Sequence, residues 1–242
     1  MRNVALIVRR ELLAYLRTPS GWVIAALVLL VNGLAFNAWA VGNEARESTV
    51  VLVRYLDFAG GMAIVTAALF SMRLLAEERA SGTHVLLFTS PIREHEIVLG
   101  KYLASLVFVT LVLLASLYLP ALIFIRGKVS WGHIFSGYLG LVLLGATTLA
   151  IGTFASSLVR HPFLAVLVTG AFAGLLELCW WAALVAEPPL RDILAYLAPF
   201  YGHYRPELER GTLRLSDLVF FASLSWLSLV AATRVLKTQR WQ

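Results

Sequence analysis

Six apolar runs of about 20 residues dominate the chain, and polar or charged connections separate them. At a rise of 1.5 Å per residue, a run of about 20 residues crosses a bilayer core of about 30 Å as one helix. The pattern predicts spans at residues 21–41, 56–75, 102–125, 134–158, 162–186 and 217–236. Two connections, 76–101 and 187–216, are long enough to hold structure of their own. We therefore expect one all-α polytopic membrane domain over residues 1–242.

Residues 1–19 are predicted to form an amphipathic helix that lies on the membrane interface and ends at Thr18-Pro19. Its apolar arc holds Val4, Ile7, Val8, Leu12 and Tyr15, and the opposite arc holds Arg2, Arg9, Arg10 and Arg17. Glu11 falls within the apolar arc. A helix that touches a protein partner as well as lipid would tolerate this mixture, and a simple topology anchor is the alternative.

Composition agrees with a membrane protein. Hydrophobic residues make up 60% of the chain and charged residues 14%, whereas soluble domains carry about 25% charged residues. The net charge of +6 is assigned to basic residues that flank the spans, so no nucleic-acid partner is expected. Twelve of the 20 Lys and Arg residues lie on the side of the two termini and the 76–101 connection. The positive-inside rule predicts that this side is cytoplasmic.

Chemistry-bearing residues are nearly absent from the predicted spans. Only Glu177 sits well inside an apolar run, where a role in a substrate path and a role in packing or oligomer contact both stay open. The histidines show no metal-ligand spacing. Gly100-Lys101 lacks the Walker A pattern, because His95 and Tyr102 stand where Gly and Ser or Thr are required. We expect no catalytic residue, metal or cofactor in this chain, and no ATP hydrolysis by it.

The connection "EERASGTHVLLFTSPIREHEIVLGKYL" between the second and third spans predicts two short helices joined at a break. Thr83 can cap a helix through Phe88, and Ser90-Pro91 is a good start for a helix that continues through Lys101. Apolar side chains presented to water on a short helix need a partner to cover them. The pattern indicates a docking element on the cytoplasmic side.

Three stretches resemble type-2 ABC-transporter permeases, and among them the gliding-motility permease group: "RRELLAYLRTPSGWV", "EERASGT-VLL-TSPI---EIVLGKYL" and "RGTLRLSDLVFFASL…TRVLKTQRW". The resemblance covers nearly the whole chain. It implies a multi-pass subunit of a bacterial inner membrane that dimerises with an identical or related permease. It also implies two separate ABC ATPase subunits, which would hold the ATP and Mg.

The resemblance implies roles for residues of the cytoplasmic connection. The coupling helix would comprise Thr83, His84, Val85, Leu86, Leu87, Phe88 and Thr89, followed by Pro91. Its supports would be Glu77, Glu78, Gly82, Gly100 and Lys101, beside Arg9, Arg10, Glu11 and Arg17 of the interfacial helix. Pairing of Glu77 and Glu78 with Arg9, Arg10 or Arg17 is one expectation, and solvated acids are the other.

The connection 187–216 contains two apolar segments too short to span, at Ile193–Leu197 and Pro199–Tyr204. The resemblance implies short re-entrant helices that close the exit. The aromatic residues of this connection could equally form an interfacial belt, namely Tyr196, Phe200, Tyr201 and Tyr204. Ser216 and Asp217 are predicted to cap the last span.

The predicted function is that of a permease in an ATP-driven exporter. A mechanical complex that acts on a periplasmic or envelope protein is the alternative. An ATP-independent channel or secondary transporter is disfavoured by the scarcity of intramembrane charge.

Overall fold

The computed structural model describes residues 2–42, 47–82, 92–125 and 127–240, and over these ranges the chain forms helices and no strand. The first half contains α1 (Arg2–Arg17), α2 (Pro19–Ala35), the π-helix η1 (Phe36–Val41), α3 (Ser48–Ser71), α4 (Ala76–Ala80), α6 (Glu94–Ala115) and α7 (Tyr118–Ile123). The second half contains α8 (Trp131–Leu158), α9 (Pro162–Ala183), α10 (Leu190–Tyr196), the π-helix η2 (Pro199–Leu208) and α11 (Leu215–Arg240).

Six stretches of the described chain are long and apolar enough to cross a membrane. They are Pro19–Val41, Ser48–Ala80, Glu94–Ile123, Trp131–Leu158, Pro162–Ala183 and Leu215–Gln239. Each of the six spans predicted from hydropathy overlaps one of them, so the prediction of six candidate spans in an all-helical chain is confirmed.

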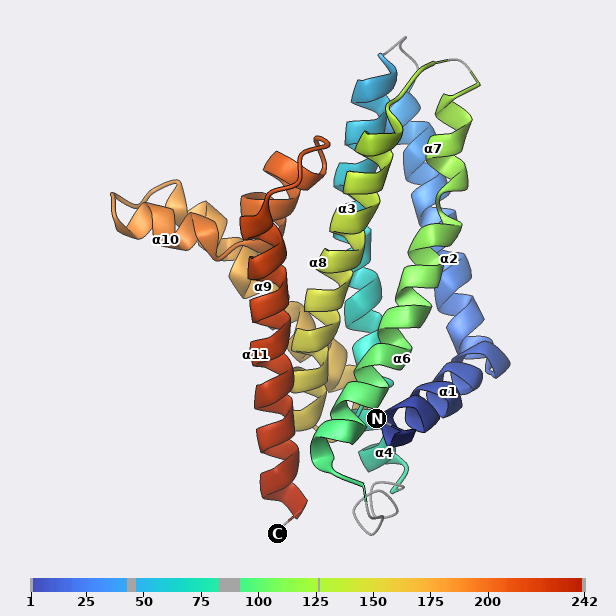
Figure 1. Cartoon of the computed structure of the whole chain (residues 1–242), viewed down its shortest axis with the longest axis vertical. Coiled ribbons are helices and arrows are strands. Elements are labelled where there is room, and N and C mark those ends of the chain that lie inside the picture. Colours follow the sequence, from blue (N-terminus) through green and yellow to red (C-terminus); the bar gives the residue numbers. More distant parts are fainter. Residues whose placement is uncertain (1, 43–46, 83–91, 126, 241–242) are drawn as a thin grey trace.

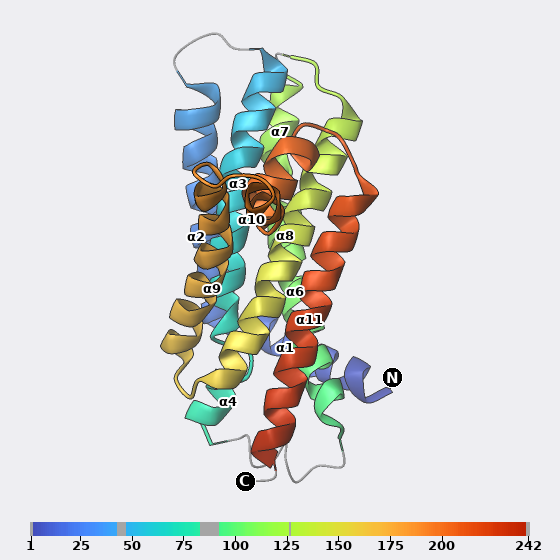
Figure 2. The same ribbon diagram turned by 90° about the vertical axis from the view of Figure 1, so that its left-hand side faces the viewer.

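Helix α8 is the core of the bundle, and α3, α6, α9 and α11 pack around it (Figures 1 and 2). Small residues on α8 allow this close packing, as at Gly137, which lies against the side chain of Leu56 of α3. Polar bonds also join the helices: the hydroxyl of Tyr138 lies 3.2 Å from that of Tyr55 and 3.0 Å from the Ser116 hydroxyl. By contrast, α2, α9 and α11 expose much of their apolar surface, as expected for helices that face lipid or another subunit.

Both chain ends and α4 lie at one end of the bundle, which we call the terminal end (Figure 1). Helix α1 lies across the bundle at this end rather than along it, and it packs on α6. Its Tyr15 is buried, whereas Leu6 is exposed. α1 ends at Arg17, where the sequence predicts the end of the N-terminal helix. Its position at a membrane interface stays a prediction.

Residues 190–208, the α10–η2 segment, begin with a helix that projects sideways from the bundle (Figure 1). The chain then turns back, and η2 packs against α3, α8, α9 and α11. In Figure 2 α10 is seen nearly end-on, in front of α8 and beside α9. Both predicted apolar segments of the connection 187–216 are therefore helical, whereas their re-entrant position in a membrane stays a prediction.

Two predicted helix starts are wrong in detail. α6 begins at Glu94 with Arg93 as its N-cap residue, later than Pro91, which lies outside the described residues. The Glu96 carboxylate accepts the Arg93 backbone N–H at 3.2 Å and so supports this later start. α11 begins at Leu215, so Asp217 lies in its first turn. The Asp217 carboxylate does not cap the helix from outside, because it binds His203 at 2.7 Å.

Candidate functional site

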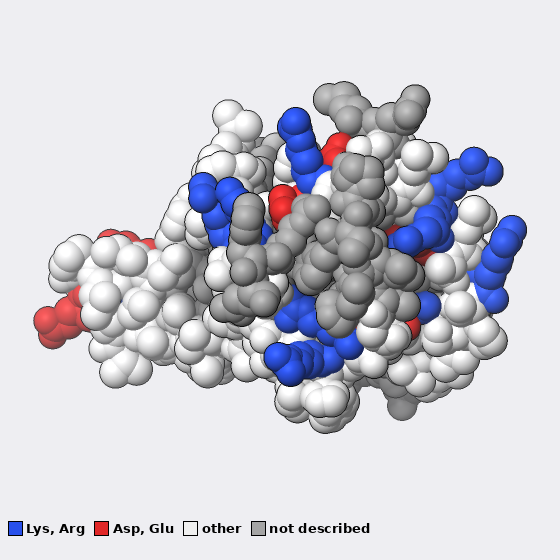
Figure 3. All heavy atoms as spheres, turned by 90° about the horizontal axis from the view of Figure 1, so that it is seen from below, with Lys and Arg blue, Asp and Glu red and all other residues white. Residues whose placement is uncertain are grey.

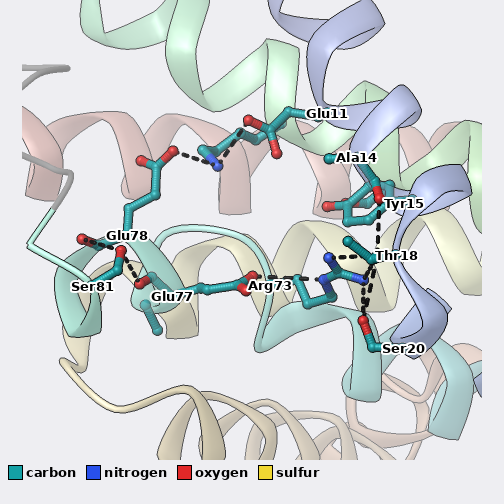
Figure 4. A network of polar contacts seen from close by, with 12 residues as sticks. Glu11, Ala14, Tyr15, Thr18, Ser20, Arg73, Glu77, Glu78 and Ser81 are labelled. Atoms are coloured by element: carbon teal, nitrogen blue, oxygen red, sulfur yellow. Dashed lines mark hydrogen bonds and ion pairs between the residues drawn. The ribbon is translucent and has the colours of Figure 1, made fainter.

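Four charged side chains from three helices meet at the terminal end, and we call this cluster the charged junction: Arg10 and Glu11 of α1, Glu78 of α4 and Lys101 of α6. Lys101 is only 2% exposed, and its Nζ lies 2.9 Å from Glu78 Oε1 and 3.4 Å from Glu11 Oε1. Arg10 lies 2.5 Å from Glu11 Oε1 and 3.5 Å from Glu78 Oε1. Figure 4 shows Glu11 and Glu78 pointing toward the same amine.

A close helix contact positions this junction. A Cβ atom on Gly100 would lie 2.7 Å from Cγ2 of Ile7, so only glycine lets α1 rest directly on α6. That contact carries Glu11, one helical turn after Ile7, over the amine of Lys101. The acid that interrupts the apolar arc of the N-terminal helix is therefore the residue that pairs with the buried lysine.

The charges of the junction balance, with two cations against two carboxylates. Burial alone would raise the pKa of Glu11, but Lys101 and Arg10 outweigh burial, and the pKa of Glu11 is lowered. A buried ammonium is tolerated only with such partners, because an unpaired charge in a low-dielectric interior is costly. The junction thus holds α1, α4 and α6 together through charge as well as packing.

Arg73 follows the end of α3 and stabilises the turn between α1 and α2. Its guanidinium donates to the Thr18 hydroxyl at 3.2 Å and to the Ser20 hydroxyl at 2.9 Å, and it lies over the ring of Tyr15 (Figure 4). Its Nε also lies 3.6 Å from Glu77 Oε2. The pairing expected of Glu77 and Glu78 with the N-terminal arginines therefore occurs for Glu78 with Arg10, whereas Glu77 pairs with Arg73.

α4 is also anchored on its other side, by α8 and α11. The Ser156 hydroxyl accepts the backbone N–H groups of Leu75 and Ala76 at 2.9 and 2.8 Å, which satisfies donors at the start of α4. Arg79 donates to the backbone carbonyl of Val159 at 3.4 Å and to the side chain of Gln239. α4 is thus fixed to four surrounding helices.

The predicted coupling helix itself, Thr83 to Thr89, and Pro91 lie outside the described residues. Gly82, the last described residue before them, has a φ of 75°, a conformation that favours glycine. Arg9 and Arg17 are exposed at the same end. Figure 3 shows lysine and arginine side chains spread around this end of the molecule. The predicted supports Glu78, Gly100 and Lys101 are brought together with Arg10 and Glu11.

The residues predicted for a path or gate fall into two groups. The Glu177 carboxylate of α9 accepts the backbone N–H of Phe200 at 2.9 Å and that of Tyr201 at 3.4 Å. Glu177 therefore caps the start of η2 from another helix, a partner that the sequence could not name. Tyr196 ends α10 and packs against a different residue, His203. The two rings are roughly perpendicular, with 4.7 Å between their centroids.

Sequence reasoning missed several residues that the structure makes important. Arg73 carries a signal in hindsight, because Glu77 follows it by four residues, the spacing at which ion pairs form along a helix. Ser156 and His203 carry none, and Asp217 is predicted only as a helix cap, because their partners lie far away along the chain or across a turn. Within the described ranges no three His, Cys, Asp or Glu side chains are placed to hold a metal ion, and we assign no metal site.

Residues 5–233 match a family model described as "ABC-2 family transporter protein". The matched region runs from α1 into α11 and includes the charged junction and the α10–η2 segment. No curated protein matches the chain.

Proposed function

We propose that this chain forms the membrane subunit of an ATP-driven exporter. The premise is that the chain belongs to the ABC-2 family of transporter proteins and is a permease component of an ABC transporter. In this proposal two permease copies, identical or related, form the translocation path and bind two separate ATPase subunits. The chain itself contributes no catalytic group, and ATP and Mg bind to the ATPase. The similarity to the gliding-motility group belongs to the same proposal.

The observation that carries the proposal is the charged junction that flanks residues 83–91. Glu78 precedes these residues in the chain and Lys101 follows them, and the two are paired at 2.9 Å. Glu11 adds α1 to the same buried amine. If an ATPase displaced residues 83–91, the movement would therefore be passed to α4, α6 and α1 together. Such a rigid base suits an element that receives mechanical work.

The distribution of basic residues supports an orientation. Twelve of the 20 Lys and Arg residues belong to the side of the chain ends and the 76–101 connection. We propose that the terminal end faces the cytoplasm of a bacterial inner membrane, so that the proposed coupling residues 83–91 lie on the side where ATP is available. The α10–η2 segment would then lie toward the outer side of the membrane.

The direct test replaces the apolar residues of the proposed coupling helix by a charge. We expect Leu86→Glu and Leu87→Glu to abolish co-purification of the ATPase with the permease, while insertion into the membrane is unchanged. Leu213→Glu is the matched control, because Leu213 is an exposed leucine outside the proposed coupling helix. If the ATPase still co-purifies with the Leu86 and Leu87 variants and transport persists, the coupling assignment is wrong.

ATPase measurements on the reconstituted complex of permease and ATPase distinguish export from mechanical work. Stimulation of ATPase activity by small molecules or lipids supports export, whereas stimulation only by a periplasmic or envelope protein supports a machine that acts on that partner. Flux through the purified chain without ATPase or ATP would contradict both readings and indicate a channel or secondary transporter.

A further inference from the structure

Arg79 of α4 is a half-buried cation whose hydrogen-bond acceptors are uncharged. Its guanidinium donates to the backbone oxygen of Val159 at 3.4 Å and to the side-chain oxygen of Gln239. Within the described ranges it forms no ion pair, whereas Arg73 and Lys101 at the same end of the bundle each pair with a carboxylate. The described residues therefore leave the positive charge of Arg79 without an opposite charge.

A second cation lies beside Arg79. Arg160 directly follows Val159 in the turn between α8 and α9, and its charge acts on Arg79 through space. The side chain of Arg160 is exposed and forms no hydrogen bond or ion pair with any residue that the structure describes. Figure 2 shows this turn beside α4 at the terminal end, and α4 also contacts α9. Two like charges repel each other, so an anion bound by both would replace repulsion by attraction.

The start of α9 adds an apolar surface next to these two cations. Phe163, Leu164 and Leu167 are exposed and share one face of the helix. This face begins three residues after Arg160 and belongs to a stretch long and apolar enough to cross a membrane. A ligand that suits both parts carries a negative charge at one end and apolar chains at the other. An anionic phospholipid has this chemistry, whereas a soluble anion would leave the apolar face uncovered.

We propose that Arg79 and Arg160 together bind the head group of an anionic phospholipid. Its acyl chains lie along the exposed apolar face at the start of α9. Basic sites between helices at the membrane surface are known to recognise anionic head groups. A guanidinium carries five N–H donors, and the contacts of Arg79 with Val159 and Gln239 leave donors for phosphate oxygens. The site is independent of the proposed export function, because neither nucleotide nor ATPase takes part in it.

The test compares two lipid probes that have the same acyl chains and differ in net charge. Phosphatidylglycerol is anionic and phosphatidylcholine is zwitterionic. Each lipid is titrated into the purified full chain in detergent micelles, and native mass spectrometry measures the fraction of chain with bound lipid. We expect the parent to bind phosphatidylglycerol at least about fivefold more tightly, because each basic residue near an anionic lipid contributes roughly this factor.

Three substitutions locate the site. Arg160→Gln removes an exposed charge without breaking a contact of the described structure, and it should weaken phosphatidylglycerol binding about fivefold. Arg79→Gln should weaken binding by at least the same factor. Arg234→Gln is the matched control, because Arg234 is an exposed arginine near the end of α11, and it should change binding by less than about twofold.

Four results would overturn the proposal. The first is equal binding of the two lipids by the parent, and the second is equal weakening by Arg160→Gln and Arg234→Gln, which would indicate only diffuse surface charge. The third is displacement of phosphatidylglycerol by glycerol phosphate at the same concentration, which would indicate a site for a soluble anion. The fourth is an Arg160→Gln variant that binds phosphatidylglycerol like the parent but no longer co-purifies with the ATPase, which would indicate an acidic protein surface as the partner.

The comparison does not depend on the most demanding variant. If Arg79→Gln does not fold, the comparison of Arg160→Gln with Arg234→Gln still decides. Because lipid binding is measured on the chain alone, failed export leaves a positive result standing. A failed lipid site likewise leaves the export proposal untouched.

Discussion

Lys101→Met tests whether the charged junction depends on its buried amine. At an effective dielectric constant of about 20, the attraction of Lys101 to Glu78 at 2.9 Å is about 6 kcal/mol, and to Glu11 at 3.4 Å about 5 kcal/mol. Desolvation of the buried ions offsets most of this attraction, and removal of one partner from a buried pair typically costs about 3–5 kcal/mol. Since Arg10 still faces both carboxylates, we expect a loss near the lower limit, about 3 kcal/mol.

A loss of about 3 kcal/mol corresponds to a change of about a hundredfold in the unfolding equilibrium. Unfolding in mixed detergent micelles, followed by tryptophan fluorescence, measures this change. Lys128→Met is the matched control, because Lys128 is exposed and the change should stay within about 0.5 kcal/mol.

The double variant Lys101→Met with Glu78→Gln sharpens the test. Glu78→Gln removes a carboxylate that the first substitution leaves without its buried cation, so the double variant should be more stable than Lys101→Met alone. The two changes should therefore couple by about 1 kcal/mol or more. Strictly additive effects, or a loss below about 1 kcal/mol for Lys101→Met, would refute the view that these charges hold α4 and α6 together.

Three further predictions concern residues that contact or follow the α10–η2 segment. Glu177→Gln keeps one acceptor oxygen but loses the charge, so hydrogen exchange of the first backbone amides of η2 should be about tenfold faster, as measured by mass spectrometry. Gly60→Ala should destabilise the chain by about 1–3 kcal/mol, because its Cβ would lie 2.6 Å from buried ring atoms of η2. Gly61→Ala, whose Cβ meets no atom within 4 Å, should be neutral or stabilising in the same unfolding assay. Burial and the nearby Asp57 carboxylate raise the pKa of Glu209 from its ordinary value of 4.5 to about 8 in the folded state. Its contribution to stability is therefore full below pH 4.5 and is lost progressively as the pH rises to about 8. Glu209→Gln should remove this part of the pH dependence of the melting temperature, and an unchanged dependence would contradict the assignment.

The charged junction shows what can and what cannot be predicted from sequence patterns. Glu11 is visible in the sequence as an acid on an apolar arc, and Lys101 as a lysine at the start of a span. Neither pattern names a partner. The pairing depends on α1 folding back across α6, a contact that only Gly100 permits at this distance. The individual residues could be predicted, but their common site could not.

Glu177 is a second residue whose importance, but not whose partner, could be predicted from the sequence. A carboxyl group within an apolar run carries a free-energy cost, so the sequence alone indicates that Glu177 has a functional or structural role. Its actual partners are two backbone N–H groups at the start of η2, which no side-chain pattern reveals. Their position follows from the reversal of the chain between α10 and η2.

The sequence by itself determined the six candidate spans and the all-helical class, because in an apolar run the backbone hydrogen bonds must be satisfied within the same segment. That requirement is local, and hydropathy with spacing suffices to express it. Tertiary structure alone decided the partners of Lys101, Glu177 and His203. A buried charge is stabilised by whatever group packing brings within about 3 Å, and packing joins helices that are distant along the chain.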